Sequence, residues 1–310
     1  MKTYKHINEF TALPNAVVTI GTFDGVHLGH RKILQQLESL SNSSNGETVL
    51  LTFFPHPRLV LQPDDNDLKL LSTLQERIHL LEAAGIDHLI VQPFDTTFAR
   101  FSAHEFVRDV LVGKIGTKIL VIGYDHHFGR NREGNFKNLE ELAPIYNYNL
   151  VQIPEHDVHQ MAVSSTKIRQ ALLCSEVHLA NELLGYQFEM SGKVVKGDQI
   201  GRTIGFPTAN IQIAESYKLI PASGIYAVRI RIDKAIFNGM LYIGNRPVIG
   251  GGELRIEVNI FDFNADIYGK EVSIALVDFI RPDQKIDGLE ALKQRLEADK
   301  IAATKALSLR

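Results

Sequence analysis

Residues 17–34 of the chain read VVTIGTFDGVHLGHRKIL, and this stretch decides how the first half is understood. It begins with the apolar run of a buried strand and ends with the spacing of an amphipathic helix. Between the two lies a glycine-rich loop that carries an aspartate and two histidines. The N-terminus of a helix offers N–H donors and a positive dipole end, which favour a phosphate group. The candidates for phosphate binding in this loop are Gly21, Phe23, Asp24, Gly25, His27, Gly29 and His30.

The rest of the first half alternates short apolar runs with helical patterns, such as the face formed by Leu74, Ile78 and Leu81. The runs are apolar at nearly every position, as strands of a parallel sheet covered on both faces should be. The alternation predicts an α/β domain with a doubly wound parallel sheet over residues 1–183. Ligands of such sheets bind beyond the carboxyl ends of the strands, where the first loop falls. The expected strands are Val17–Ile20, Thr48–Phe54, His88–Val91, Ile119–Ile122 and Leu150–Ile153.

The sequence pattern changes after Gly185. Residues 226–233, 254–263 and 271–279 alternate apolar and polar side chains with period two, and glycine-rich turns separate them. That pattern predicts an antiparallel sheet or small β-barrel over residues 184–310. The chain closes with an expected helix, on which one face carries Leu289, Leu292 and Leu296. We expect the domain boundary near Leu184–Ser191.

The overall composition is that of a soluble globular protein, with 45% hydrophobic and 22% charged residues among 310. The net charge of −3 argues against a non-specific grip on nucleic acid or anionic lipid. The single cysteine, Cys174, excludes an intramolecular disulfide framework and fits a reducing cytoplasm. No signal peptide and no membrane-spanning run is expected. The expected partners are therefore small molecules, and a weak or transient homo-oligomer stays open.

The first loop lacks the phosphate-loop pattern G-x-x-x-x-G-K-[ST] and has no cysteine nucleophile. Its chemistry would then depend on positioning and charge stabilisation, as phosphoryl-type transfers do. Two alternatives remain from the residues alone. His27 and His30 could be a helix cap and a surface residue, or two ligands of a metal site whose third ligand no spacing indicates.

Two segments of the first half resemble elements of the nucleotidyltransferase superfamily, which transfers a nucleotide from a triphosphate and releases pyrophosphate. His27-Leu28-Gly29-His30 resembles the H-x-G-H signature, and SSTKIR at residues 164–169 resembles the element S-S-T-x-I-R. Ser165 and Thr166 can cap the helix that follows, and the guanidinium of Arg169 can bind two phosphate oxygens. An ordinary helix cap is the alternative for this second segment.

Two further segments, FFPHP at residues 53–57 and GYDHHFGRNREGN at residues 123–135, resemble the bacterial bifunctional riboflavin kinase/FAD synthetase family. The resemblance implies that the first domain adenylylates FMN to FAD. Core packing is the alternative for Phe53, Phe54 and Phe128. The implied flavin-binding candidates of this domain are Phe54, Pro55, His56, Pro57, Asp125 and Phe128.

The segment GRTIGFPTAN at residues 201–210 resembles the riboflavin kinase signature G-x-P-T-A-N. Pro207 fixes its own φ and keeps the preceding residue extended, so Thr208 and Asn210 follow a stiff segment. Both offer neutral oxygen ligands that suit Mg²⁺ carrying nucleotide phosphates, and Gly201 and Gly205 leave room for those phosphates. The implied co-substrate is ATP, with Mg²⁺ as the metal.

Glu257 lies at the position of the catalytic glutamate in that family, and a carboxylate base suits the transfer of phosphate to a hydroxyl. Strand parity places Arg255, Glu257 and Asn259 on one face, for which a solvated strand face is the alternative. Arg281 in FIRP also resembles the family and is a flavin-binding candidate. The family implies phosphorylation of riboflavin to FMN by ATP and then adenylylation to FAD with release of pyrophosphate.

Two rival functions are weighed against this one. The first keeps the transferase domain but gives it another substrate, such as a small phosphorylated alcohol or pantetheine, with the barrel as a regulator. The PTAN segment together with Glu257 argues against it. The second is a non-enzymatic flavin or nucleotide sensor, and the presence of Glu257, His27 and His30 argues against that.

Overall fold

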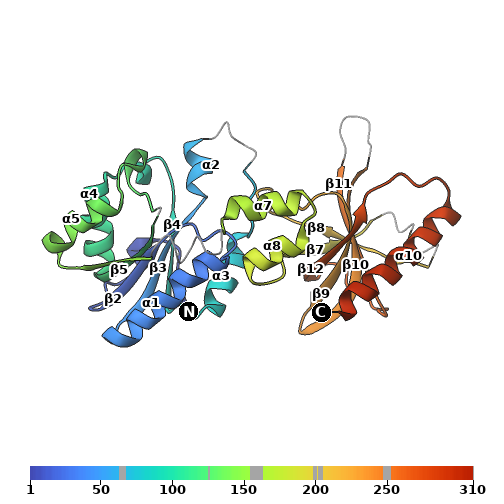
Figure 1. The fold of residues 1–310 in the computed structure, drawn as a ribbon, viewed down its shortest axis with the longest axis horizontal. Helices are drawn as coiled ribbons and strands as arrows, with labels where there is room; N and C mark the ends of the chain where they lie inside the picture. The colour runs from blue at the N-terminus through green and yellow to red at the C-terminus, as the bar shows by residue number, and fades with distance from the viewer. Residues whose placement is uncertain are drawn as a thin grey trace. The chain divides into compact units, whose positions relative to one another are not determined.

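The computed structural model describes residues 1–62, 68–124, 126–153, 163–197, 201, 205–246 and 253–309. The chain divides by its packing into two compact units, Met1–Ser164 and Ser165–Arg310 (Figure 1). Each unit has its own sheet, so each is described by itself.

The first unit contains a six-stranded sheet in the order β1-β4-β3-β2-β5-β6, and every neighbouring pair is parallel. The predicted doubly wound sheet is therefore confirmed. The edge strand β1 was not predicted, because it has only three residues and no apolar run. The strands are β1 (Lys2–Tyr4), β2 (Ala16–Ile20), β3 (Glu47–Phe54), β4 (His88–Pro93), β5 (Thr117–Gly123) and β6 (Asn149–Ile153).

Helices cover both faces of this sheet. Alternate side chains of β2 point to opposite faces, so Val17 joins the core that contains Leu37 and Leu81, whereas Val18 joins the core that contains Phe106. Each fully buried side chain of this size contributes about 1.5–3 kcal/mol. The helical segments are η1 (Ile7–Glu9), α1 (Leu28–Ser44), α2 (Pro57–Leu61), α3 (Leu74–Ala83), η2 (Phe98–Arg100), α4 (Ala103–Glu105), η3 (Phe106–Ile115), η4 (Arg130–Arg132) and α5 (Phe136–Tyr146).

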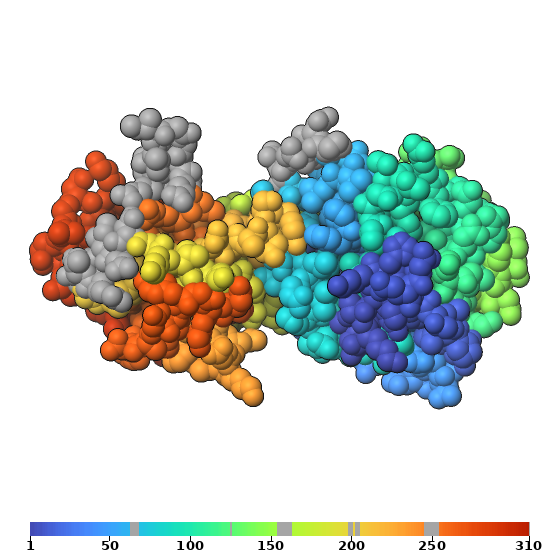
Figure 2. Space-filling model, turned by 180° about the vertical axis from the view of Figure 1, so that it is seen from behind, coloured from blue at the N-terminus to red at the C-terminus, as the bar shows by residue number. Residues whose placement is uncertain are grey.

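The N-terminal residues pack on one face of this unit. Ile7 and Phe10 belong to the same core as Phe106 and Val107 of η3. In the space-filling view of Figure 2 the start of the chain, in dark blue, lies beside the green segments of this unit. The short edge strand β1 is thus held by the packing of the residues that follow it.

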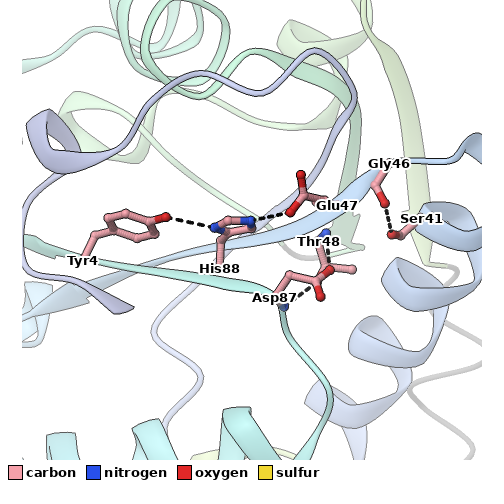
Figure 3. A network of polar contacts seen from close by, with 7 residues as sticks. All are labelled: Tyr4, Ser41, Gly46, Glu47, Thr48, Asp87 and His88. Atoms are coloured by element: carbon pink, nitrogen blue, oxygen red, sulfur yellow. Dashed lines mark hydrogen bonds and ion pairs between the residues drawn. The ribbon is translucent and has the colours of Figure 1, made fainter. Parts of the chain in front are cut away.

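A polar network joins β1 to the amino ends of β3 and β4 (Figure 3). The ring of the buried His88 lies 3.1 Å from the hydroxyl of Tyr4 through Nδ1 and 2.8 Å from Glu47 Oε2 through Nε2. Asp87 accepts hydrogen bonds from the backbone N–H and the hydroxyl of Thr48. The network lies at the amino edge of the parallel strands, whereas the first loop leaves the carboxyl edge.

The second unit contains a closed barrel in the order β10-β11-β8-β7-β12-β9, with antiparallel neighbours. The predicted antiparallel barrel is confirmed, and the three expected segments correspond to β9, β11 and β12. The strands are β7 (Glu189–Val195), β8 (Ala209–Gln212), β9 (Gly224–Ile232), β10 (Ala235–Arg246), β11 (Glu253–Ile260) and β12 (Glu271–Pro282).

The C-terminal helix α10 (Leu289–Ser308) packs on the barrel and is red in Figure 1. Of the three leucines on the predicted face, Leu292 is half-buried and Leu296 packs against the barrel core. Leu289 is 60% exposed, whereas Ala303 and Leu307 join the core that contains Phe206. Leu289 is the first residue of the helix, and the face that it shares with Leu296 reaches the core further along.

Two helices that precede the barrel pack within the second unit, α7 (Ser165–Leu173) and α8 (Val177–Leu184). The side chain of Asn181 donates to the carbonyl of Leu276 over 3.0 Å and accepts from the N–H of Phe188 over 2.8 Å. His178 lies 2.9 Å from Asp278. The division by packing, after Ser164, therefore comes earlier in the chain than the change of sequence period after Gly185. The change of period marks where the barrel strands begin, whereas the packing also depends on where α7 and α8 dock. A functional boundary at 183/184 stays a prediction.

Candidate active sites

The loop after β2 places both histidines of the first motif at the start of α1. The Nδ1 atom of His27 accepts a hydrogen bond of 3.3 Å from the N–H of His30 and so caps the helix. The two rings stack with centroids 3.7 Å apart, and the Phe23 ring lies 4.8 Å from that of His30. The helix-cap alternative therefore holds for one nitrogen of His27, which is 6% exposed, whereas His30, the surface residue of that alternative, is half-buried.

The surroundings of His30 favour the neutral form of its imidazole. Burial lowers the pKa of His30 well below 6.5, and the nearby His27 and Arg77 lower it further. A neutral imidazole still has one N–H that can donate to a phosphate oxygen. The metal-site alternative gains no support, because no group of three or more His, Cys, Asp or Glu side chains that could hold a metal occurs among the described residues.

The other candidates of this loop are three glycines and two buried side chains. Gly21 follows β2 and donates to the carbonyl of Leu51, and Gly25 has a φ of 78° that favours glycine. Gly29 is buried in the first turn of α1. Phe23 and Asp24, in contrast, are each 2% exposed. Phosphate binding stays a prediction for the whole set, and the side chains of Phe23 and Asp24 point into the protein.

The flavin-binding candidates of the first unit follow β3, the neighbour of β2, at the same carboxyl edge. Phe54 is partly buried, and Pro55 leads into α2, which His56 caps by accepting from the N–H of Arg58 over 3.2 Å. Pro57 is the first residue of that helix. The sheet thus brings this segment and the His27–His30 loop to one edge.

Phe128 follows β5, the other neighbour of β2, and belongs to the core with Phe106. Core packing therefore describes most of its ring, since it is 8% exposed. The His126 ring stacks on it with centroids 5.9 Å apart. Asp125, the remaining flavin-binding candidate here, lies outside the described residues.

Ser165, Thr166 and Arg169 lie in α7, which packs in the second unit. The helix begins at Ser165, so Ser165 and Thr166 are its first two residues and do not precede it. Their role in binding phosphate stays a prediction.

The barrel brings together the kinase candidates from two distant segments. Thr208 donates a hydrogen bond of 3.1 Å from its hydroxyl to Glu257 Oε2, and Arg255 Nη1 lies 3.4 Å from Glu257 Oε1. Asn210 is the direct neighbour of Glu257 in the pairing of β8 with β11. Because paired residues point to the same face, the side chains of Thr208, Asn210 and Glu257 offer a hydroxyl, an amide and a carboxylate on one face.

The strand parity expected for β11 is confirmed. Ile256 and Val258 are buried in the barrel, while Arg255 and Glu257 lie on the opposite face. Asn259 follows the same parity as Glu257 but is only 7% exposed. Its side chain donates to the carbonyl of Pro207 over 2.7 Å. That bond fixes the PTAN segment against β11.

The two glycines of the kinase motif have different surroundings, with open space at Gly205 and close backbone packing at Gly201. A Cβ atom at Gly201 would overlap the carbonyl oxygen of Phe206 and lie 3.6 Å from the hydroxyl of Thr208. Gly205 has a φ of 85°, and Phe206 is buried in the barrel core. Gly201 is therefore needed for close packing of the backbone against Phe206, and room for phosphates at the two glycines stays a prediction.

Tyr242 is a neighbour of Glu257 that sequence reasoning missed. It pairs directly with Glu257 across β10 and β11, and its hydroxyl donates to Asp283 over 3.1 Å. Burial, then the carboxylate of Asp283, raises the pKa of Tyr242 to about 12. Its hydroxyl therefore stays protonated at neutral pH. No spacing in the sequence points to it, because the pairing depends on barrel register.

Arg281 makes a two-point ion pair that sequence reasoning also missed. Its Nε and Nη2 atoms donate to Asp299 of α10 over 2.8 Å and 2.7 Å. The side chains of Arg281 and Asp299 are 10% and 3% exposed. Flavin binding by Arg281 stays a prediction, and the guanidinium already anchors α10 to β12.

Two family models match the chain, one for each unit's motifs. The FAD synthetase model matches residues 10–167 and the riboflavin kinase model matches residues 184–307. The bifunctional riboflavin kinase/FMN adenylyltransferase of Escherichia coli K12 is 35% identical over 312 residues, covering 100% of this chain and 99% of that protein. The chain belongs to this bifunctional family.

Other members of the bifunctional family agree over most of the chain. The protein so named from Listeria monocytogenes is 37% identical and covers 92% of this chain and 90% of its own length. The protein so named from Bacillus subtilis is 34% identical and covers 94% of this chain and 93% of its own length. The chain therefore combines a FAD synthetase domain with a riboflavin kinase domain.

A solved structure supports the fold of the whole chain. It has a TM-score of 0.87 and 32% identity, covers 98% of both chains, and is described as a macrolide-efflux protein from Streptococcus pneumoniae. In the part of the present chain that the structure describes, no helix has the length and hydropathy to span a bilayer. Members of the bifunctional family match the same full length, so that description does not alter the assignment to the family.

Proposed function

We propose that this chain phosphorylates riboflavin to FMN with ATP and then adenylylates FMN with a second ATP to give FAD and pyrophosphate. The observation that carries the proposal is the meeting of Thr208, Asn210 and Glu257 on one barrel face. A regulatory barrel would have no need of a carboxylate beside two neutral oxygen ligands, which disfavours the rival transferase with another substrate. The same carboxylate disfavours a mere flavin sensor.

In the kinase reaction Glu257 takes the proton of the primary hydroxyl of riboflavin while the oxygen attacks the γ-phosphorus of ATP, and ADP leaves. The hydrogen bond from Thr208 orients one carboxylate oxygen of Glu257. Room for the phosphates at Gly201 and Gly205 is part of the proposal, and the open space beside Gly205 supports it. Flavin contact by Arg281 is a further part of the proposal.

Thr208 and Asn210 are the proposed holders of Mg²⁺ at this site. A hydroxyl and an amide beside a carboxylate are a donor set that suits this metal when nucleotide phosphates supply further oxygens. When bound there, the metal would supply positive charge that stabilises the charge developing on the nucleotide phosphates. The two side chains fix where the nucleotide phosphates lie relative to Glu257.

In the adenylyl transfer His27 and His30 donate to the triphosphate as charge develops on the leaving pyrophosphate. The N-terminus of α1 favours the same anion. The proposal includes Gly21, Gly25 and Gly29 as positions that let the backbone approach it closely. We extend the proposal to Ser165, Thr166 and Arg169 as further phosphate ligands. For FMN it names the segment Phe54–Pro57 together with Asp125 and Phe128.

The proposed setting is the cytoplasm, with ATP, riboflavin and FMN as partners and without nucleic acid. The net charge of −3 and the single cysteine support it. Any self-association is proposed to be weak or transient.

The test separates the two reactions by chromatography of flavins. Wild-type protein with riboflavin, ATP and Mg²⁺ should give FMN and then FAD. Glu257→Gln keeps the size of the side chain but removes the base, so riboflavin turnover should fall by about 10²–10⁴-fold while supplied FMN is still adenylylated. Normal phosphorylation by Glu257→Gln would refute the base role.

The complementary variants are His27→Ala and His30→Ala. Each should reduce FAD formation by about 100-fold or more, the effect of losing one donor worth about 2.7–4 kcal/mol. Phosphorylation should survive, so FMN should accumulate. Full FAD output from the double variant would end the proposed role of the histidines.

A further inference from the structure

The loop that carries His27 and His30 has an unusual backbone. Phe23 and Val26 have φ angles of 48° and 36°, in the left-handed region that residues with a Cβ seldom adopt. A β-branched residue such as Val26 is especially unfavourable there. Both side chains are at most 2% exposed, so packing holds them. A strained loop persists only when its surroundings fix it at several points.

One fixing point is the carboxylate of Asp24, which is 2% exposed. It accepts hydrogen bonds from the N–H groups of Leu71 and Ser72 over 3.0 Å and 3.1 Å, and from the Ser72 hydroxyl over 3.3 Å. The Ser72 hydroxyl also lies 3.1 Å from the N–H of Gly25, which donates to it. Asp24 therefore ties the middle of the loop to the segment that leads into α3.

The second fixing point is Arg77, in the first turns of the same helix and 1% exposed. Its Nη1 atom donates to the carbonyl oxygen of Thr22 and lies 3.4 Å from the hydroxyl of Thr52. Thr52 in turn donates to the same carbonyl over 3.3 Å. Arg77 thus ties the start of the loop to both α3 and β3.

We propose that Asp24 and Arg77 are positioning residues of adenylyl transfer, which with Ser72 hold the Thr22–His30 loop in the conformation that receives the triphosphate. Both side chains are too buried to touch a substrate, so they act through the loop backbone. The inference rests on the proposed function of the first unit. It assigns to Asp24 a role toward the loop in place of direct phosphate binding.

The surroundings of Arg77 agree with this role. Its charge lies close enough to His30 to lower the pKa of that imidazole, after the larger effects of burial and His27. Arg77 faces inward, because it shares the helix face of Leu74, Ile78 and Leu81. The side chain of Asp24 is also buried. The carboxylate of Asp24 and the guanidinium of Arg77 bond to polar atoms of the loop, of β3 and of the segment before α3. Apolar side chains at these two positions could not make those bonds.

The experiment compares Arg77→Met and Asp24→Asn with His88→Gln in the full chain. His88 is a matched control, because it is a buried polar residue of the same sheet at the opposite, amino edge. The thermal midpoint is measured for each, together with kcat and KM for ATP in FMN adenylylation and the rate of riboflavin phosphorylation as an internal control.

Well below the midpoints, Arg77→Met and Asp24→Asn should lose at least about 10-fold in kcat for adenylylation, since a misplacement of about 1 Å can cost 100-fold. Phosphorylation should be unchanged. His88→Gln should retain adenylylation even where its midpoint falls as far. Arg77→Lys, which keeps the charge, should recover part of the rate. If kcat for adenylylation fell in proportion to the drop in thermal midpoint in every variant, His88→Gln included, the inference would be overturned.

Hydrogen exchange gives a readout independent of activity. Amides of residues 22–30 should exchange faster in Arg77→Met and Asp24→Asn and unchanged in His88→Gln. If either strong variant does not fold, Ser72→Ala, which removes one hydroxyl, serves in its place with the same expected direction. Unchanged exchange in the folded variants would overturn the inference. Absence of FAD formation by wild-type protein would refute the proposed function alone, because the exchange result stands apart from it.

Discussion

The hydroxyl of Thr208 donates a hydrogen bond of 3.1 Å to the carboxylate of Glu257, although the two residues are 49 positions apart in the sequence. The bond links the proposed metal ligand to the proposed base. A change at Thr208 should therefore alter both the nucleotide site and the orientation of Glu257.

Thr208→Ala should raise the KM for Mg-ATP and lower kcat in riboflavin phosphorylation, because it removes the proposed metal ligand and the donor to Glu257. Thr208→Ser, which keeps the hydroxyl, is the matched control and should retain most of the activity. Steady-state kinetics at several Mg²⁺ concentrations measure both. Equal loss in the serine and alanine variants would show that the methyl group, and not the hydroxyl, matters.

Arg281→Met should destabilise the barrel, by less than the about 3–5 kcal/mol that a fully unpaired buried charge costs. Asp299 loses its two-point partner and keeps only the more distant Arg295, whose Nε atom lies 3.6 Å away. Urea unfolding measures the effect. The double variant Arg281→Met with Asp299→Leu should recover much of that stability, because neither charge is then buried. Equal stability of the single variant and wild-type protein would contradict the anchoring role.

The same double variant tests the flavin contact predicted for Arg281. A raised KM for riboflavin in a stable double variant would support that contact. An unchanged KM would leave Arg281 with the structural role toward α10 only.

The stability of the first unit should depend on pH through His30. Its folded-state pKa is lowered below 6.5, so the unfolded chain binds the proton more tightly than the folded one. The free energy of unfolding should then fall as pH decreases below about 6.5 toward the folded pKa. His30→Gln has no such proton, so its stability should fall less over that range. Calorimetry of both proteins between about pH 7.5 and pH 5.5 compares the slopes, and equal slopes would contradict the expectation.

The isolated second unit, residues 165–310, should fold and convert riboflavin to FMN without forming FAD. The shorter piece 184–310 keeps Thr208, Asn210 and Glu257 but lacks Asn181, whose two hydrogen bonds to the barrel are worth about 0.5–1.5 kcal/mol each. It should therefore have a lower thermal midpoint and keep kinase activity only while folded. A folded 165–310 piece without kinase activity would show that this site needs residues of the first unit.

The sequence by itself determined the class of each unit. Side-chain period is a local property, so apolar runs predicted the parallel strands β2 to β6, and alternation predicted barrel strands such as β11. The position of His27 at a helix start was also local, because capping depends on residues three apart. The motifs then indicated a family that the comparisons confirm.

Only the tertiary structure decided which side chains meet. Asp24 and Ser72, Thr208 and Glu257, and Arg281 and Asp299 come together because strand register and helix docking bring distant segments into contact. Period does not encode such pairings, so the sequence did not indicate the bonds that Asp24 and Arg281 make, and their roles toward phosphate and flavin stay predictions. The docking of α7 and α8 is of the same kind: a helix shows its apolar face in the sequence, but the sheet that it packs against depends on the folded chain.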